Sequence, residues 1–240
     1  MTATHANALV AAMAAEIHDG DVIATGVASP LAVLAIAVAR ATHAPRLTYL
    51  ACVGAVNPDV RRLHASSEDL AYLDGRRGDI AIPDLFDHAR RGRIDIIFFG
   101  AAEVDSAGRS NMSATGSLAR PTVKLPGVAG AAALRRWVRR PVLLMPKQTK
   151  RNLVERVQVA STVDGRPTPL LTDLGRFQVG CEGASLHSYR AWTTPAEIAE
   201  RTGFPFTVAA GLQAEAAPSA ATLAAIGALD PDNLRERLVG

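Results

Sequence analysis

The residues best suited to chemistry in this sequence lie between positions 94 and 116. An apolar run at 94–99 ends at Gly100, and a polar, glycine-punctuated loop follows it. The run is typical of a strand buried on both faces in a parallel sheet, and open α/β sheets place ligand sites in the loop after such a strand. We therefore expect a binding or catalytic site at 100–116, with Glu103 as a candidate general base. The other polar side chains and glycine pivots of the loop are Asp105, Ser106, Ser110, Asn111, Ser113, Thr115, Gly108 and Gly116.

Two roles are open for Asp105 and Asn111. Either side chain can contact a ligand, because the loop is expected at the ligand-binding edge of the sheet. Short polar side chains of this kind also bond to nearby backbone groups and fix loops in place. The sequence does not favour one role over the other.

Cys52 is a second candidate, because it lies at the end of a predicted strand at 47–53. A thiolate is a competent nucleophile. The histidines His43 and His64, which could activate it, are close only in sequence. Cysteine is also among the most frequently buried residues, so we favour a packing role for Cys52 over a catalytic one. The other cysteine is Cys181, and neither has the spacing of a metal ligand, so we predict no metal site and a reduced, cytoplasmic protein.

Composition narrows the class of protein. The chain has 240 residues, of which 48% are hydrophobic, and these values predict a well-packed globular protein rather than a disordered one. A net charge of +3 gives no reason to expect nucleic acid. Arginines cluster at 61–62, 76–77, 90–93 and 135–140, where solvated helix faces are a better interpretation than a polyanion site, because no aromatic residues are interleaved. The N-terminus lacks the basic region of a signal peptide, and the most apolar window is interrupted by Gly and Pro, so no membrane association is predicted.

The elements that must position these residues alternate between strand and helix. This order predicts a single α/β domain over 1–240, with an open, mostly parallel sheet flanked by helices and with terminal helices within 219–240. Ser29 followed by Pro30, and Thr194 followed by Pro195, are N-terminal helix signals. We expect helices at 6–18, 31–42, 82–91, 193–202, 219–228 and 231–238, strands at 21–24, 47–53, 94–99, 141–145, 157–163, 169–173, 174–179 and 184–191, and a flexible link at 212–217.

Six stretches in order together resemble the β subunit of family I coenzyme A transferases, closest to the glutaconate CoA-transferase type. They are THAPRLTYLACVGAVNPD at 42–59, GAAEVDSAGRSNMS at 100–113, RPTVKLPGVAGAAAL at 120–134, KRNLVERVQVAST at 150–162, TDLGRFQV at 172–179 and TTPAEIAERTGF at 193–204. Each motif is weak alone, and the combination covers roughly residues 6 to 206. The resemblance implies an open α/β fold that works as an α–β pair, often as an α2β2 heterotetramer.

The resemblance also implies a reaction. The family's transferases use a β-subunit glutamate that attacks an acyl-CoA thioester, and they need no cofactor beyond the CoA of the substrate. A carboxylate is a poor nucleophile, so its environment must orient it and stabilise the oxyanion, which glycine loops can do through backbone N–H groups. The loops at 100–116 and 126–131 are expected to shape the pocket, with CoA or substrate contacts at Gly54, Asp105, Asn111, Ser113, Gly127 and Gly130.

The sequence departs from the family pattern at this site. Matching Gly54 and the Pro58-Asp59 pair to the pattern places Cys52 where the family has glutamate, and no acidic residue stands between 45 and 57. Arg109 replaces an asparagine of the polar loop. In the glycine loop, Ala129 stands at the second glycine, unless that glycine is displaced, and Ala133 stands at an acidic position.

The β subunits of actinobacterial steroid-ring-opening CoA hydrolases resemble this chain and also lack the glutamate, since their catalytic glutamate belongs to the α subunit. We therefore expect the β subunit of a hydrolase- or lyase-like enzyme that acts on an acyl-CoA with an α partner. The alternatives are a true transferase subunit, a scaffolding subunit without a catalytic role, and a regulatory binder of CoA thioesters.

Overall fold

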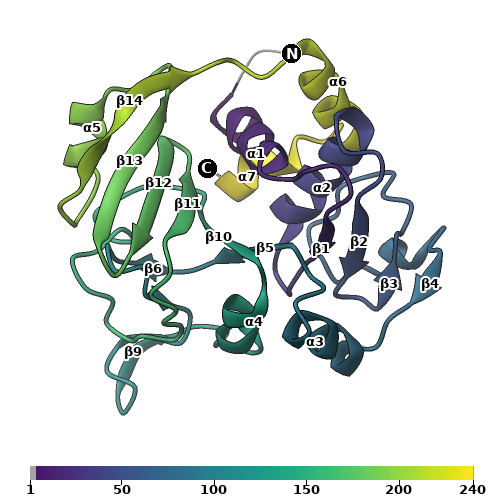
Figure 1. The fold of residues 1–240 in the computed structure, drawn as a ribbon, viewed down its shortest axis with the longest axis horizontal. Coiled ribbons are helices and arrows are strands. Elements are labelled where there is room, and N and C mark those ends of the chain that lie inside the picture. Colours follow the sequence, from purple (N-terminus) through teal and green to yellow (C-terminus); the bar gives the residue numbers. More distant parts are fainter. Residues whose placement is uncertain (1–3, 240) are drawn as a thin grey trace. The chain divides into compact units, whose positions relative to one another are not determined.

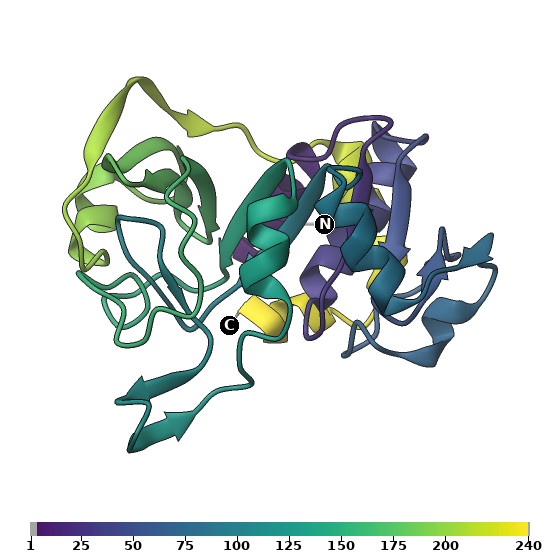
Figure 2. The same ribbon diagram turned by 60° about the horizontal axis from the view of Figure 1, so that its bottom comes forward.

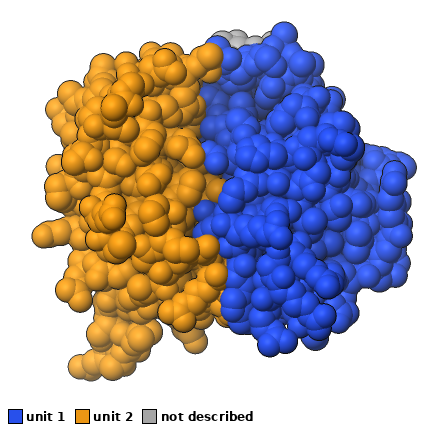
Figure 3. All heavy atoms as spheres, in the orientation of Figure 1, with its two compact units in different colours: residues 1–98, 137–141, 217–240 blue, residues 99–136, 142–216 orange. Residues whose placement is uncertain are grey.

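The computed structural model describes residues 4–239. The chain divides into two compact units, coloured separately in Figure 3. Unit 1 contains residues 1–98, 137–141 and 217–240, and unit 2 contains residues 99–136 and 142–216. The single domain predicted over 1–240 stays a prediction.

Unit 1 consists of a sheet and its helices (Figure 1). Its strands follow the order β5-β1-β2-β3-β4. Strand β1 pairs in parallel with both β2 and β5, whereas β3 pairs antiparallel with both β2 and β4. The elements are α1 (His5–Ala15), β1 (Val22–Ala24), α2 (Pro30–Thr42), β2 (Thr48–Ala51), β3 (Ala55–Val56), the 3-10 helix η1 (Leu70–Leu73), β4 (Gly78–Asp79), α3 (Ile82–Arg90), the start of β5 (Ile96–Gly100), α6 (Ala220–Leu229) and α7 (Leu234–Val239).

The core of unit 1 lies between helices α1 and α2 and the sheet. The apolar face predicted for the first helix is confirmed, since Leu9, Met13 and Ile17 are all buried. Helix α2 begins with Pro30 in its first turn and is buried along its first ten residues. Because so many of these residues are alanine or valine, neighbouring elements can pack close to the helix on several sides.

Unit 2 is built on strands in the order β14-β13-β12-β11-β10. The pairs β10–β11 and β13–β14 are parallel, and β11–β12 and β12–β13 are antiparallel. Its elements are β6 (Glu103–Val104), β7 (Ser110–Asn111), β8 (Ala114–Gly116), β9 (Pro121–Lys124), α4 (Ala131–Trp137), most of β10 (Arg140–Met145), β11 (Thr168–Thr172), β12 (Gly175–Gly180), β13 (Gly183–Arg190), α5 (Pro195–Glu200) and β14 (Thr207–Glu215).

Two small hairpins stand apart from the main strands of unit 2. Strands β6 and β7 form one, and β8 and β9 form the other, which extends away from the rest of the unit in Figure 2. All four residues of β9 are exposed. The loop predicted at 100–116 therefore contains short strands, and its polar side chains lie on or beside them.

The α/β class predicted from the sequence is confirmed, as are the two terminal helices. Two predictions were wrong. The segment 157–163 forms no strand, although Thr162 makes an isolated bridge to Ser110. The predicted link at 212–217 is instead mostly the end of β14. No helix within 4–239 has the length and apolar character needed to cross a membrane.

Candidate active site

Cys52 lies in the tight turn of the β2–β3 hairpin. Ala51 pairs with Ala55, so residues 52–54 form the connection, and the Gly54 N–H donates to the Ala51 carbonyl at 2.9 Å. Gly54 has φ +102, a conformation that favours glycine. Its carbonyl accepts from the Ile80 N–H at 2.9 Å, which ties the turn to the chain beyond β4. The predicted position of Cys52 after the second strand is therefore a rigid turn.

The half-buried thiol of Cys52 is held by two neighbouring segments. Its Sγ donates to the Ser67 carbonyl at 3.4 Å, and its backbone N–H donates to Thr25 Oγ1 at 3.4 Å. Thr25 Oγ1 lies 3.0 Å from the hydroxyl of buried Tyr49. Burial raises the pKa of the Cys52 thiol, and hydrogen bonds involving Ser67 and Thr25 oppose that rise only in part. The group is therefore a thiol, not a thiolate, at neutral pH.

The two histidines near Cys52 in sequence bond to other groups. His43 Nε2 lies 3.1 Å from the carbonyls of both Ala14 and Ile17. His64 Nδ1 lies 3.1 Å from Asp69 Oδ2, and its ring packs edge-on against Tyr72. These contacts give no support to a Cys–His nucleophile pair, in which the two side chains are within hydrogen-bond reach.

Three residues beside Cys52 were missed from the sequence: Thr25, Ser67 and Glu68. The segment 66–69 forms no α-helix, and the helical turn that follows it is the short η1, which begins at Leu70. Ser67 instead bonds to the loop after β1, about forty residues earlier in the chain. Such a long-range contact leaves no local pattern in a single sequence.

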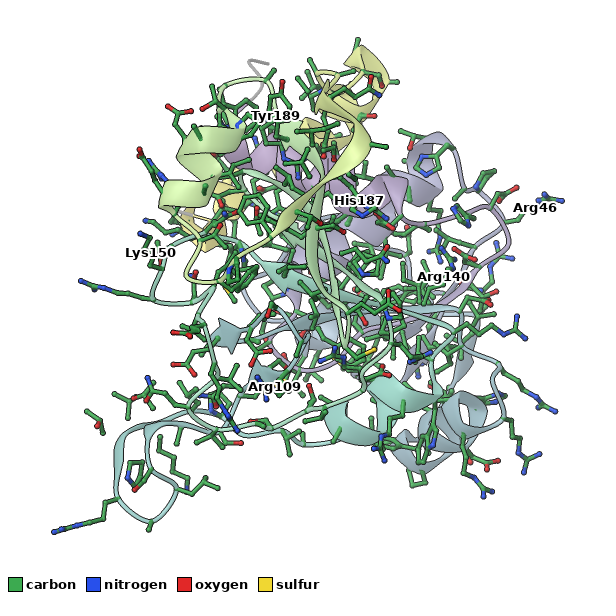
Figure 4. All side chains as sticks on the ribbon, turned by 60° about the vertical axis from the view of Figure 1, so that its left-hand side comes forward. Arg46, Arg109, Arg140, Lys150, His187 and Tyr189 are labelled. Carbon is green, nitrogen blue, oxygen red and sulfur yellow. The ribbon has the colours of Figure 1, made fainter. Side chains whose placement is uncertain are left out.

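In unit 2 the predicted carboxylates are buried and hydrogen-bonded within the protein. Glu103 Oε2 accepts from Asn111 Nδ2 at 2.8 Å and from the Gln158 N–H at 2.9 Å, and Oε1 accepts from Gln158 Nε2 at 2.9 Å. Asp105 is fully buried and pairs with Arg109 at 2.7 Å, labelled in Figure 4. A buried carboxylate with these hydrogen-bond partners fixes the loop that carries it. The role of Glu103 as a general base stays a prediction.

Asn111 and Ser113 also bond to their own loop. Asn111 Nδ2 donates to the Ala114 carbonyl at 2.7 Å, and its Oδ1 accepts from the Ser113 N–H at 3.0 Å. The Ser113 hydroxyl lies 2.7 Å from that of Ser161. Of the two roles left open by the sequence, the geometry favours the pinning of the loop for Asn111, as it does for Asp105.

Arg135 lies in the same buried network of unit 2. Its Nη1 donates to Thr162 Oγ1 at 2.9 Å, and Thr162 Oγ1 also bonds to the Ser110 hydroxyl. Asp164 lies 3.9 Å from Arg135 Nε. Burial lowers the pKa of Arg135, although Asp164 and Asp105 favour its charged form. The network links α4 to the segment after residue 155 and has a structural role.

The glycine loop before α4 keeps an unusual backbone at the position of the family's second glycine. Gly127 has φ +100, and Ala129 has φ +42, in the left-handed region that glycine prefers. The Gly130 carbonyl accepts from the Leu134 N–H at 3.0 Å as the helix begins. The loop therefore has the backbone of a glycine-rich turn, although one of its members carries a side chain.

The predicted site residues form two groups. Cys52 and Gly54 belong to unit 1, and the others belong to unit 2, where Glu103, Asp105, Asn111 and Ser113 share one hydrogen-bonded cluster. The described residues contain no group of three or more His, Cys, Asp or Glu side chains placed to hold a metal ion. A cavity of about 140 Å³ in unit 1 is lined by none of the predicted site residues; its walls are Asp59, Arg61, Arg62, His64, Ala71, Tyr72 and Asp74.

Comparison with solved structures gives close and distant relatives. The chain is 61% identical to a chain of the decarboxylase AibA/AibB, with a TM-score of 0.97 and complete coverage of both chains. Four variants of that decarboxylase, each with one cysteine replaced by Asn, Ala, Val or Ser, match with 60% identity and the same TM-score. The fold is also that of Rhodococcus jostii IpdAB (23% identity, TM-score 0.85, complete coverage of both chains) and of the Acidaminococcus fermentans glutaconate CoA-transferase (19%, 0.82, 95% of each chain).

Sequence comparison agrees with these folds. The chain is 28% identical to a 3-oxoadipate CoA-transferase subunit of Pseudomonas knackmussii, over 92% of this chain and 91% of that protein. The family model described as Coenzyme A transferase matches residues 7–168. The resemblance seen in the sequence motifs is confirmed, and the chain belongs to the coenzyme A transferase family.

Proposed function

We propose that this chain is the β-type subunit of a two-subunit enzyme that decarboxylates an acyl-CoA. The observation that carries the proposal is the 61% identity, over the whole of both chains, to a chain of the decarboxylase AibA/AibB. The sequence predicted a hydrolase- or lyase-like member of the family, and a decarboxylase is a lyase. The α-type partner, the heterotetramer and the use of CoA as part of the substrate belong to the same proposal.

The cysteine variants of the relative support a role for Cys52. Identity falls from 61% to 60% in all four variants, as expected if the replaced cysteine aligns with a cysteine of this chain. This chain has two cysteines, and Cys181 is exposed beside the β12–β13 turn. Cys52 is the better counterpart, because it occupies the turn in which the family motif places its nucleophile.

The chemistry of decarboxylation suits a thiol better than a carboxylate at this position. Loss of carbon dioxide breaks a carbon–carbon bond and leaves its electron pair on the acyl group, where the thioester carbonyl takes it up as an enolate. The enolate carbon then needs a proton. The Cys52 thiol can donate that proton and regain one from water, and its raised pKa keeps it protonated until then. This reaction forms no covalent acyl-enzyme, so it does not need the nucleophilic glutamate of the transferases.

The experiment is to co-express the chain with its α-type partner and to supply glutaconyl-CoA, an unsaturated acyl-CoA, with its one free carboxylate carrying a carbon label. We expect labelled carbon dioxide and a shortened acyl-CoA, with one solvent-derived deuterium in product formed in heavy water. Cys52→Ala should lower kcat by a factor of about 100 or more, as for loss of a general acid. The matched control, Cys181→Ala, should keep the activity of the unaltered enzyme.

Three outcomes would contradict the proposal. Transfer of CoA to acetate, with an acyl-enzyme that hydroxylamine traps, would indicate a transferase. Release of free CoA or a ring-opened CoA product without carbon dioxide would indicate a hydrolase. An intact complex that turns over none of a panel of dicarboxylic acyl-CoA substrates would indicate a scaffolding subunit.

A further inference from the structure

The segment Ser66–Glu68 joins two parts of unit 1 that surround Cys52. One part is the loop at 25–29 between β1 and α2, and the other is the β2–β3 turn. Ser67 bonds to both. The sequence predicted neither this segment nor its contacts as part of a site.

Ser67 is the central residue of this connection and is fully buried. Its Oγ lies 3.1 Å from the Gly26 carbonyl and accepts from the Ser29 N–H at 3.0 Å. The Ser67 carbonyl oxygen accepts a hydrogen bond from Cys52 Sγ at 3.4 Å. The direction of the thiol hydrogen is thus set by a residue that also fixes the loop after β1.

Glu68 bonds to both sides of Ser67. Its Oε2 lies 2.9 Å from the Ser67 hydroxyl and accepts from the Ser66 hydroxyl at 2.6 Å. Its Oε1 accepts from the Ala28 N–H at 3.2 Å. Ala28 has φ +54, a left-handed conformation that is costly for a residue with a side chain, so the bond helps to hold a strained loop. Desolvation opposes ionisation of Glu68, but these hydrogen bonds outweigh it and lower the pKa of the carboxyl.

We propose that Glu68 is a positioning residue for Cys52: it fixes the Ser67 carbonyl and the 25–29 loop around the thiol, and so sets the direction of the thiol hydrogen. The proposal rests on the proposed function, in which Cys52 is the proton donor. Glu68 acts through Ser67 and through its charge, without contact to the reacting atoms.

The charge of Glu68 gives this role a measurable signature. The titratable groups facing Cys52 are Glu68 on the 66–69 segment and Tyr49 on β2, and both are acids. The pKa of Cys52 is raised first by burial and further by the Glu68 carboxylate. Removal of that negative charge therefore makes the thiolate easier to form.

The test uses the complex with its α partner and a Cys181→Ser background, so that Cys52 is the remaining thiol of this chain. Alkylation of the chain by iodoacetamide is followed by mass spectrometry across pH. Glu68→Gln keeps the size of the side chain and removes its charge. We expect the midpoint of the alkylation curve to shift to lower pH by about 0.3 to 0.7 of a unit. The matched control is Asp84→Asn, which removes one exposed negative charge from α3 and should leave the midpoint unchanged.

Turnover gives the second measurement. Glu68→Gln should lower kcat by about tenfold with little change in KM. The substitution changes the direction of the Cys52 thiol, which donates the proton, and leaves the binding of the substrate unaltered. An unchanged alkylation midpoint, or a shift to higher pH, would overturn the proposal. The alkylation curve needs no substrate, so a shift to lower pH in a complex that releases no carbon dioxide would reject the decarboxylase reaction and retain the role of Glu68.

Discussion

At the scale of the residue, hydrogen bonds and burial give Glu103 and Cys52 different roles. Glu103 receives three hydrogen bonds from within the protein and fixes the polar loop. Cys52 makes one weak thiol bond and remains half-buried in a tight turn. A carboxylate with all its partners supplied by the protein is poorly placed to accept a proton from substrate, whereas a thiol that burial keeps protonated can donate one.

We predict that Glu103→Gln affects stability and not chemistry. The new amide places a donor group among the donors Asn111 Nδ2, Gln158 N–H and Gln158 Nε2, so at least one hydrogen bond is lost in a buried site. Urea unfolding should show a loss of about 2 kcal/mol, while kcat of the folded complex stays within a factor of about two or three. Glu155→Gln, at an exposed position, is the control and should change neither quantity. A hundredfold fall in kcat at unchanged stability would make Glu103 the general base.

At the scale of the element, caps and apolar periodicity predicted most helices but only half of the strands in the described residues. Thr194 and Glu197 form the capping box expected at the start of α5. The strand predicted at 157–163 failed because backbone donors there bond to side chains: the Val157 N–H bonds to Asp105 and the Gln158 N–H to Glu103. Strand β14 was missed because its alanines have low strand propensity, although it pairs in parallel with β13.

The candidate site was predictable only in part. The family motif located Cys52 and the polar loop, because those residues are contiguous in sequence. The Ser67 and Glu68 contacts to Ser29 and Ala28 span about forty residues, and no periodicity or cap encodes them. Only the folded chain brings these residues together.

The glycine loop before α4 gives a prediction about this element. Ala129 has φ +42, so Ala129→Gly should relieve backbone strain and raise the free energy of unfolding by about 1 kcal/mol. Ala132→Gly, an exposed position inside α4, should instead lower it by about 0.5–1 kcal/mol. Chemical denaturation of the two variants beside the unaltered chain measures both. A loss of stability in Ala129→Gly would show that other contacts of the alanine outweigh its conformational cost.

At the scale of the whole molecule, the chain passes between the two units repeatedly. Unit 1 takes its last helices from residues 217–240, after the chain has completed unit 2. Helix α7 joins the first helix of the same unit through Arg235, whose Nε donates to Asn7 Oδ1 at 2.6 Å. Arg235 is buried and also pairs with buried Asp230 at 2.8 Å. The integrity of unit 1 therefore depends on segments more than two hundred residues apart.

Arg235→Met tests this connection. The substitution keeps an apolar stem but leaves the carboxylate of Asp230 buried without its cation, so we expect a loss of about 3 kcal/mol. Thermal unfolding and hydrogen exchange of α1 should both report the change, the latter as faster exchange in the first helix. Arg237→Met, at an exposed position of α7, serves as the comparison and should behave like the unaltered chain. Equal stability of the two variants would mean that Arg235 contributes no more than a surface residue.

The protonated state of Cys52 has a consequence outside catalysis. Peroxide oxidises thiolates, and susceptibility to sulfenic acid formation follows thiolate character and exposure. Enzymes that depend on an ionised cysteine are therefore inactivated readily under oxidative stress. A turn that holds Cys52 half-buried and un-ionised therefore makes its sulfur less susceptible to peroxide than an exposed, ionised cysteine would be.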